Sequence, residues 1–349
     1  MEKHGRVKRF FYKKREKIRG FFIFLVILSG IIPTATLSLS YPETVSGNSG
    51  QSEDFIISDD LEYNGVSIFE KYRLPEEEIP DGAHKVLKTT LGAAKWMDSF
   101  GGVTVNNEGK KNFDIEKLLS EKSEIKVDKT KKYQVLIVHT HATESYNVYN
   151  TDYYDGSMKF RSDDNNQNMI HIGNIIASKL EDAGYGVIHD KTQHDNPDYN
   201  RSYDSSNLSI YSYLEKYPKI QIVLDVHRDT VITSSKTKYR AVAEINGETA
   251  AQVMILLGSG SEKYINDHWE ENLKFSLMIQ KKAAEKYPGL MRPILLRNYL
   301  YNQDITPGSI LVEVGTCGNT PEEAEKGAGY FAECLAEVLD VINEKGVLQ

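Results

Sequence analysis

Short apolar runs alternate with amphipathic stretches along the second half of the chain. Residues 133–139, 220–226 and 310–314 are mostly apolar runs bounded by polar residues, which predicts buried strands. Residues 168–183 carry apolar side chains at helical spacing, and Gly184 follows as a helix stop. Strands that alternate with helices predict an α/β domain with an open, mostly parallel sheet and helices on both faces.

Further segments extend this pattern on both sides. The additional helices expected are residues 205–216, 270–287 and 321–343, the last with Thr320 as N-cap. The additional strands expected are residues 186–189, 239–245, 251–257 and 294–297, with Asn246 and Gly247 forming a turn. Before residue 131 the signal is weaker, and it favours helix at residues 83–100 and, in part, at residues 115–127.

The N-terminal region has a different character. Residues 1–19 contain nine Lys or Arg against two Glu, and residues 20–40 are largely apolar. A basic segment followed by about 20 apolar residues predicts a single transmembrane anchor with a cytoplasmic N-terminus. Small residues around Ala35 also suit a signal peptidase, so a cleaved signal is the alternative to a retained anchor. Residues 41–130 are predicted to be an extracytoplasmic linker or accessory region, and residues 131–349 the catalytic domain.

The composition of the chain limits the kinds of partner and of metal site that we expect. The formal net charge of −8 argues against a nucleic-acid partner, which would favour a basic face. The chain has two cysteines, Cys317 and Cys334, and no CxxC pair. A metal site in this protein would therefore use histidine and carboxylate ligands rather than thiolates.

The densest chemical motif is His139-Thr-His141-Ala-Thr-Glu144, directly after the first strand. Zn²⁺ favours imidazole nitrogen and carboxylate oxygen, and a catalytic site uses three protein ligands. His141 and Glu144 are the predicted ligands from this turn, and His227, at the polar end of the run 220–226, is the third. Because the carboxyl ends of parallel strands meet at one edge of a sheet, these side chains are expected to converge.

Two further residues are candidates for catalysis. Glu313 is a carboxylate inside an otherwise apolar strand, and such a group can act as general base beside a metal. Arg228 can neutralise a substrate carboxylate or a developing oxyanion. His139 and His194 are candidates for orienting a ligand or contacting substrate, and the alternative for Glu144 is a cap on the turn.

Several separated segments resemble the stage II sporulation protein P family over residues 133–345. They are Ile137-Val-His-Thr-His-Ala-Thr-Glu-Ser145, His194-Asp195, Ser202-Tyr203, Asp225-Val-His-Arg-Asp229, Tyr301-Asn-Gln303 with Pro307-Gly-Ser309, and Leu311-Val-Glu-Val-Gly315. That family is similar to the zinc-dependent N-acetylmuramoyl-L-alanine amidases. The likeness gives ligand roles to His141, Glu144 and His227 and the catalytic role to Glu313. The common amidases place the ligand Glu further downstream, where this chain has Asp163 and Asp164, so these two remain alternatives to Glu144.

The resemblance implies a membrane-anchored peptidoglycan hydrolase of sporulation that acts during septal thinning and engulfment. It implies cleavage of the N-acetylmuramoyl-L-alanine amide and of stem-peptide cross-links, with zinc as cofactor. It also implies a complex with the sporulation proteins D and M at the septal membrane. The alternatives are a zinc carboxypeptidase or peptidase acting on free peptides, and an inactive anchored scaffold.

Overall fold

The structure is a computed structural model that describes residues 54–57, 62–63, 66–67 and 79–344 of the 349. The predicted cytoplasmic segment 1–19 and the predicted anchor 20–40 lie outside these residues. Among the residues that the structure describes, no helix is both long and apolar enough to cross a membrane.

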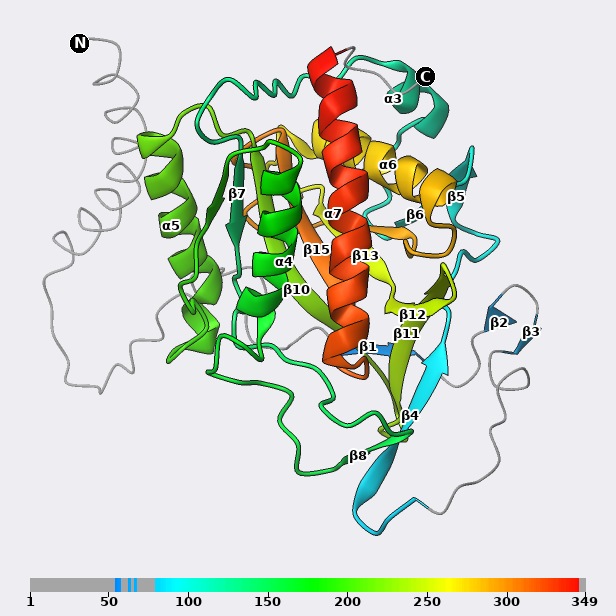
Figure 1. The fold of residues 1–349 in the computed structure, drawn as a ribbon. Helices are drawn as coiled ribbons and strands as arrows, with labels where there is room; N and C mark the ends of the chain where they lie inside the picture. The colour runs from blue at the N-terminus through cyan, green and yellow to red at the C-terminus, as the bar shows by residue number, and fades with distance from the viewer. Residues whose placement is uncertain (1–53, 58–61, 64–65, 68–78, 345–349) are drawn as a thin grey trace, which may run out of the picture. The chain divides into compact units, whose positions relative to one another are not determined.

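A mixed sheet runs through the described part of the chain and contains thirteen strands (Figure 1). Its central strand, β10 (Ile222–Thr233), pairs in parallel with β7 (Val135–Val138) and with β15 (Gly308–Thr316), and β9 (Val187–His189) pairs in parallel with β7. The other strands of this sheet are β1 (Asp54–Ile57), β4 (Ala83–Thr89), β5 (Asp98–Phe100), β6 (Val103–Asn107), β8 (Tyr153–Asp155), β11 (Lys238–Ile245), β12 (Glu248–Ala251), β13 (Val253–Gly258) and β14 (Ile294–Arg297). A separate hairpin joins β2 (Glu62–Tyr63) to β3 (Val66–Ser67).

The strand directions agree only in part with the mostly parallel sheet that the sequence predicts. β10 continues into β11 and β12 through tight turns, and β13 follows directly, with no helix between them. A tight turn reverses the chain, so β11 runs antiparallel to β10, and β13 runs antiparallel to β15. Asn246 and Gly247 both have positive φ in the turn between β11 and β12, which confirms the turn predicted there.

Helices cover both faces of the sheet, as predicted (Figure 1). The larger core lies under α4 (Met169–Asp182), α6 (Trp269–Lys286) and α7 (Pro321–Glu344), which pack on the alternate residues of β10 and β15 that include Leu224 and Val312. On the opposite face, α5 (Ser202–Lys216), preceded by a 3₁₀ turn η1 (Tyr199–Arg201), packs on Leu136 and Val223. A short helix α3 (Ile115–Ser120) contributes to the larger core. We call these the α4 face and the α5 face.

The long C-terminal helix begins where the sequence predicts, for a local reason. Glu323 N–H donates to Thr320 Oγ1, and Thr320 N–H donates back to the Glu323 carboxylate. This reciprocal arrangement satisfies two backbone donors at the helix start, and Pro321 occupies the first helical position, where its missing N–H matters least. The predicted N-cap at Thr320 is therefore confirmed.

The prediction of helix at residues 83–100 is wrong. This stretch contains β4, which pairs in parallel with β11, and β5, which pairs with β6. Pairing with distant strands outweighs a weak local helical pattern, since strand formation depends on the neighbours available in the fold. The division of the chain at residue 131 stays a prediction, although β4 and β6 pair with strands that lie beyond it.

Candidate metal centre

A short turn after β7 carries His141 and Glu144. Glu144 N–H donates to the His141 carbonyl, which closes the turn. The turn is held against residues 160–162, because Ser145 N–H donates to the Phe160 carbonyl and Glu144 forms an isolated bridge with Arg161. These contacts with residues 160–162 fix the direction in which the Glu144 side chain leaves the backbone.

The third predicted ligand, His227, lies on β10. Side chains alternate along a strand, so His227 faces the α5 face together with Asp225, while Val226 faces the α4 core. In the parallel pairing of β10 with β15, His227 lies directly opposite Glu313. The strand register therefore places the candidate base beside the candidate ligand.

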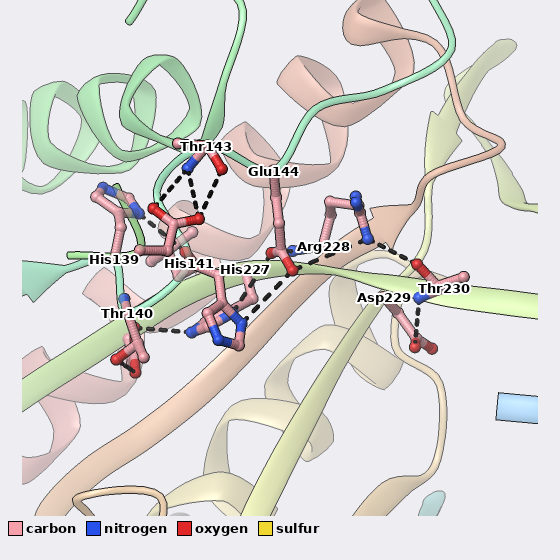
Figure 2. A network of polar contacts seen from close by, with 12 residues as sticks. His139, Thr140, His141, Thr143, Glu144, His227, Arg228, Asp229 and Thr230 are labelled. Atoms are coloured by element: carbon pink, nitrogen blue, oxygen red, sulfur yellow. Dashed lines mark hydrogen bonds and ion pairs between the residues drawn. The ribbon is translucent and has the colours of Figure 1, made fainter. Parts of the chain in front are cut away.

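The ligand atoms of His141, Glu144 and His227 all lie within 4.8 Å of one another (Figure 2). His141 Nδ1 is 3.7 Å from Glu144 Oε1, and His227 Nδ1 is 3.4 Å from Glu144 Oε2. Glu144 and His227 are buried, and His141 keeps a small exposed edge. Two imidazoles and a carboxylate at this separation are a donor set that fits Zn²⁺ with one position left for water or substrate.

Electrostatics within this group suit a cation. Burial lowers the pKa of His141 to about 3, so its imidazole is neutral and able to donate a lone pair. Burial would also lower the pKa of His227, but Asp225 and Glu144 together hold it well above its ordinary value. Burial would raise the pKa of Glu144, yet Arg228, His227 and His141 hold it below its usual range. The His227 ring thus lies between two carboxylates, and a metal ion can replace the proton on Nδ1, the nitrogen that faces Glu144.

Asp225 supports His227 from behind. His227 Nε2 lies 2.9 Å from Asp225 Oδ1, which leaves Nδ1 directed at Glu144. Thr140 fixes the Asp225 carboxylate by donating its backbone N–H and its hydroxyl to the two oxygens. The Thr140 hydroxyl also contacts Ser206 Oγ at 2.7 Å. A carboxylate on the far nitrogen of a ligating histidine sets its tautomer and strengthens its donor atom.

Glu313 has the environment of a general base or acid. It lies at the edge of the site, half-buried, with Oε2 covered and without a hydrogen-bond partner. Burial and the neighbouring Asp229 carboxylate raise the pKa of Glu313 well above its ordinary value. Asp229 itself is held by Arg292, whose Nη1 is 2.7 Å from Asp229 Oδ2.

The contacts of Arg228 do not agree with the catalytic role predicted for it. Its guanidinium donates to the carbonyls of Ser145 and Phe160 and to Thr230 Oγ1, and it is buried. Its backbone N–H donates to Glu144 Oε2. Figure 2 shows the side chain directed toward Thr230 rather than toward His227. The guanidinium also lies 3.9 Å from Glu144 Oε1, so Arg228 holds the Glu144 turn in place.

His139 and His194 are placed outside the ligand group. His139 Nδ1 bonds the Val226 carbonyl at 2.9 Å, and its Nε2 is 2.8 Å from His189 Nε2, on the α4 face. His194 contacts Ser205 Oγ and Asp190 in the loop before α5. Neither histidine contacts a candidate ligand, so the structure gives them no part in orienting one, and contact with substrate stays a prediction.

The alternatives to Glu144 are also separated from the group. Asp163 contacts Asn196, and Asp164 accepts hydrogen bonds from Asn166, both on an exposed loop. In the part of the chain that the structure describes, the carboxylate that joins His141 and His227 is Glu144.

Three supporting residues carried no role in the sequence-based prediction. Asp225 could have been found from the alternation along the strand, two positions before His227. Tyr199 stacks on His141, with ring centroids 4.6 Å apart and planes at 17°, and Arg161 lies over the Tyr199 ring. Arg161 also bonds Asp195, which accepts from Thr143 in the ligand turn. No local pattern marks Tyr199 or Arg161, because both reach the site from a different loop.

The family model for stage II sporulation protein P (SpoIIP) matches residues 95–336, which include the three candidate ligands and Glu313. The chain belongs to the stage II sporulation protein P family. Stage II sporulation protein P of Bacillus subtilis (strain 168) is 31% identical over 215 residues, covering 58% of this chain and 50% of that protein. The chain thus matches about half the length of this relative.

Solved amidase structures show a more distant likeness to this family member. An N-acetylmuramoyl-L-alanine amidase from Clostridium difficile 630 is 16% identical, with a TM-score of 0.34, over 62% of this chain and 100% of that one. The CwlD amidase from Clostridioides difficile, solved with the GerS lipoprotein, is 12% identical, with a TM-score of 0.36, over 60% and 98%. At these TM-scores the likeness carries no argument about the activity of this chain.

Proposed function

We propose that this protein is a zinc-dependent peptidoglycan hydrolase of sporulation. It cleaves the amide between N-acetylmuramic acid and L-Ala and, at the same site, the cross-links between stem peptides. The observation that supports this most is the meeting of His141, Glu144 and His227 beside Glu313 on the adjacent strand. Membership of the stage II sporulation protein P family supports the role in sporulation.

His141, Glu144 and His227 would hold the zinc. When bound, Zn²⁺ supplies Lewis acidity that polarises an amide carbonyl and makes water easier to deprotonate. Asp225 keeps His227 oriented, and Arg228 and Arg161 keep the Glu144 turn in place.

Glu313 supplies the proton transfers of amide hydrolysis. It takes a proton from the attacking water, whose oxygen forms the new bond to the carbonyl carbon. It then gives that proton to the leaving amine as the C–N bond breaks, so the carboxylate is regenerated. A carboxylate with a raised pKa suits both steps, because it can hold the proton between them.

The place of action is also part of the proposal. The basic segment 1–19 and the apolar segment 20–40 would anchor the protein in the membrane, with the hydrolase outside the cytoplasm. Peptidoglycan at the engulfing septum would be the substrate, and the sporulation proteins D and M would be the partners.

Alanine substitution of Glu313 tests the assignment. The Glu313→Ala chain should hydrolyse purified cell wall about 10²–10⁴-fold more slowly, because it lacks the proton-transferring group. Its zinc content should stay at the level of the unmodified chain, since Glu313 is outside the ligand set. Glu116→Ala, an exposed carboxylate on α3, is the matched control and should retain full activity.

The same assays separate the competing functions. Mass spectrometry of the products identifies the bond that is cleaved. Cleavage of free peptides without hydrolysis of intact walls would favour a carboxypeptidase. Absence of both bound zinc and turnover would favour an inactive scaffold. Near-normal wall hydrolysis by Glu313→Ala would contradict the role given to this residue.

A further inference from the structure

Two motifs from distant parts of the chain meet next to the candidate metal centre. Tyr203, in the first turn of α5, lies with its ring edge toward His141 at a centroid distance of 5.6 Å. Tyr301, in the loop after β14, has its ring centroid 6.2 Å from that of Tyr203. Tyr299 follows at 5.6 Å from Tyr301 and is exposed. We call Tyr203, Tyr301 and Tyr299 the tyrosine row.

The loop that carries Tyr301 has a costly backbone conformation. Tyr301 and Asn302 have φ values of 49° and 55°, two consecutive non-glycine residues in the left-handed region. Each such residue costs about 1 kcal/mol or more and persists only where surrounding contacts impose it. Strain of this kind concentrates at functional sites.

Asn302 provides the contacts that hold this conformation. Its Nδ2 donates to the Tyr203 carbonyl and to Ser206 Oγ, both at 3.1 Å, and its Oδ1 accepts from Asn207. The adjacent Gln303 is buried and bonds the backbone of β13 through both ends of its amide. Ser206 in turn contacts Thr140, which holds Asp225 behind His227. The loop is thus fixed relative to the ligand set.

The row lies on the face of the sheet that displays Glu313. Tyr301 packs on a small apolar cluster that includes Met254 and Leu311. Met254 is directly opposite Glu313 in the sheet, and Leu311 precedes Glu313 by two positions on the same face. The row therefore begins at a candidate ligand, packs on the sheet face that carries the candidate base and ends at the surface.

We propose that the tyrosine row binds the sugar rings of the glycan strand while its stem amide lies at the metal centre. This inference rests on the proposed function, because it assumes peptidoglycan as the substrate. Asn302 is a positioning residue that holds Tyr301 in the row. The row would favour substrates whose stem peptide is still attached to the glycan strand.

The chemistry of the row favours a saccharide over a stem peptide. A tyrosine ring presents an electron-rich face to the C–H groups of a pyranose, and its hydroxyl suits the polar rim of the sugar. The three side chains of the row are uncharged, so the row offers ring faces rather than an ionic contact.

Binding to stem-free glycan strands tests the row without turnover. These strands are prepared by removing all stem peptides, so they contain no N-acetylmuramoyl-L-alanine amide to cleave. For the full chain, Tyr299→Ala and Tyr301→Leu should each raise the Kd about tenfold, which corresponds to about 1.4 kcal/mol. Tyr299→Phe should bind as the unmodified chain does, because it keeps the ring face. Tyr149→Ala, an exposed aromatic in the loop before β8 at the other end of the strand order, is the matched control.

The outcomes separate this inference from the proposed function. Unchanged Kd values in both row variants, or no glycan binding by the unmodified chain, would overturn the row even if walls are hydrolysed normally. Displacement of the glycan by equal concentrations of stem-peptide dimers would also overturn it, in favour of a peptide subsite. Row-dependent glycan binding by a chain that hydrolyses nothing would support the row and contradict the proposed hydrolase.

Discussion

Two pairs of histidines lie close together around the central strands, on opposite faces of the sheet. The metal pair, His141 and His227, faces α5 and shares the Glu144 carboxylate. The second pair, the fully buried His139 and the partly buried His189, faces α4, and its two Nε2 atoms are 2.8 Å apart; we call it the buried pair. The metal pair is surrounded by carboxylates. In the buried pair, His139 bonds the Val226 carbonyl and the two rings bond each other. Residues of the same type, two positions apart in sequence, thus have different electrostatic environments.

The difference shows what makes a histidine pair suited to a metal. Burial lowers the pKa of His139 to about 4 and that of His189 to about 3, so both imidazoles are neutral. One of them must donate its proton to the other, which uses the lone pair that a metal would need. In the metal pair the lone pairs converge with a carboxylate, and Asp225 holds the remaining nitrogen of His227. Carboxylate neighbours, rather than imidazole density alone, distinguish the site.

The largest expected contrast is in zinc affinity. His227→Ala removes a ligand and should raise the Kd for Zn²⁺ by more than about 100-fold. His189→Ala, the matched change in the buried pair, should alter this Kd by less than about threefold. Competition with a chromogenic chelator measures both. Equal losses in the two variants would abolish the distinction between the pairs.

A smaller change in zinc affinity is expected from the support behind His227. Asp225→Asn keeps the shape and one acceptor oxygen for Thr140 but removes the charge, and the Kd for Zn²⁺ should rise about 10–100-fold. Asp190→Asn is the control, because Asp190 contacts His194, a histidine outside the ligand set. If Asp190→Asn weakened zinc binding as much as Asp225→Asn does, a general effect on the fold would replace the specific one.

A packing change should affect the buried pair alone. A methyl group on Gly173 in α4 would lie 2.5 Å from His139 Nε2 and 2.6 Å from His189 Nε2. Gly173→Ala should therefore lower the free energy of unfolding by about 1–3 kcal/mol without changing zinc affinity. Gly329→Ala in α7 meets only Lys179 at 3.9 Å and should gain up to about 1 kcal/mol from helix propensity. Urea unfolding of both variants gives the comparison, and a stabilised Gly173→Ala would show that the rings move aside easily.

The smallest expected effect is on the pH dependence of stability. His139 and His189 have folded-state pKa values below the ordinary 6.5, so the unfolded chain binds more protons between about pH 4 and 6.5. Their contribution to stability is complete above pH 6.5 and is lost as the pH falls through this window. His189→Gln should reduce the slope of unfolding free energy against pH by about 1 kcal/mol per unit at most. An unchanged slope in chelator-treated protein would mean that His189 does not titrate in this way.

Much of the α/β architecture follows from local patterns. The apolar runs around β7, β10 and β15 are unfavourable in water and are stable when buried between two layers of helices. Their strand character is therefore visible in the sequence. Helix α7 begins at Thr320 because its capping contacts lie within four residues. The region before residue 131 lacks such signals, and β4 forms because β11 offers it an unpaired edge.

The sequence alone also determined the chemistry of the site. The motif around His141 and Glu144, the polar end of the strand before His227, and the isolated carboxylate at Glu313 are all local features. Tertiary structure decided which of the nearby polar residues join them. Arg228 bonds the carbonyls of Ser145 and Phe160, and a turn brings His141 to the α5 face while His139 stays on the other. Tyr199 and Tyr203, around the start of α5, and Tyr301, in the loop after β14, reach the site from segments distant in sequence from its ligands, so no local pattern predicts these contacts.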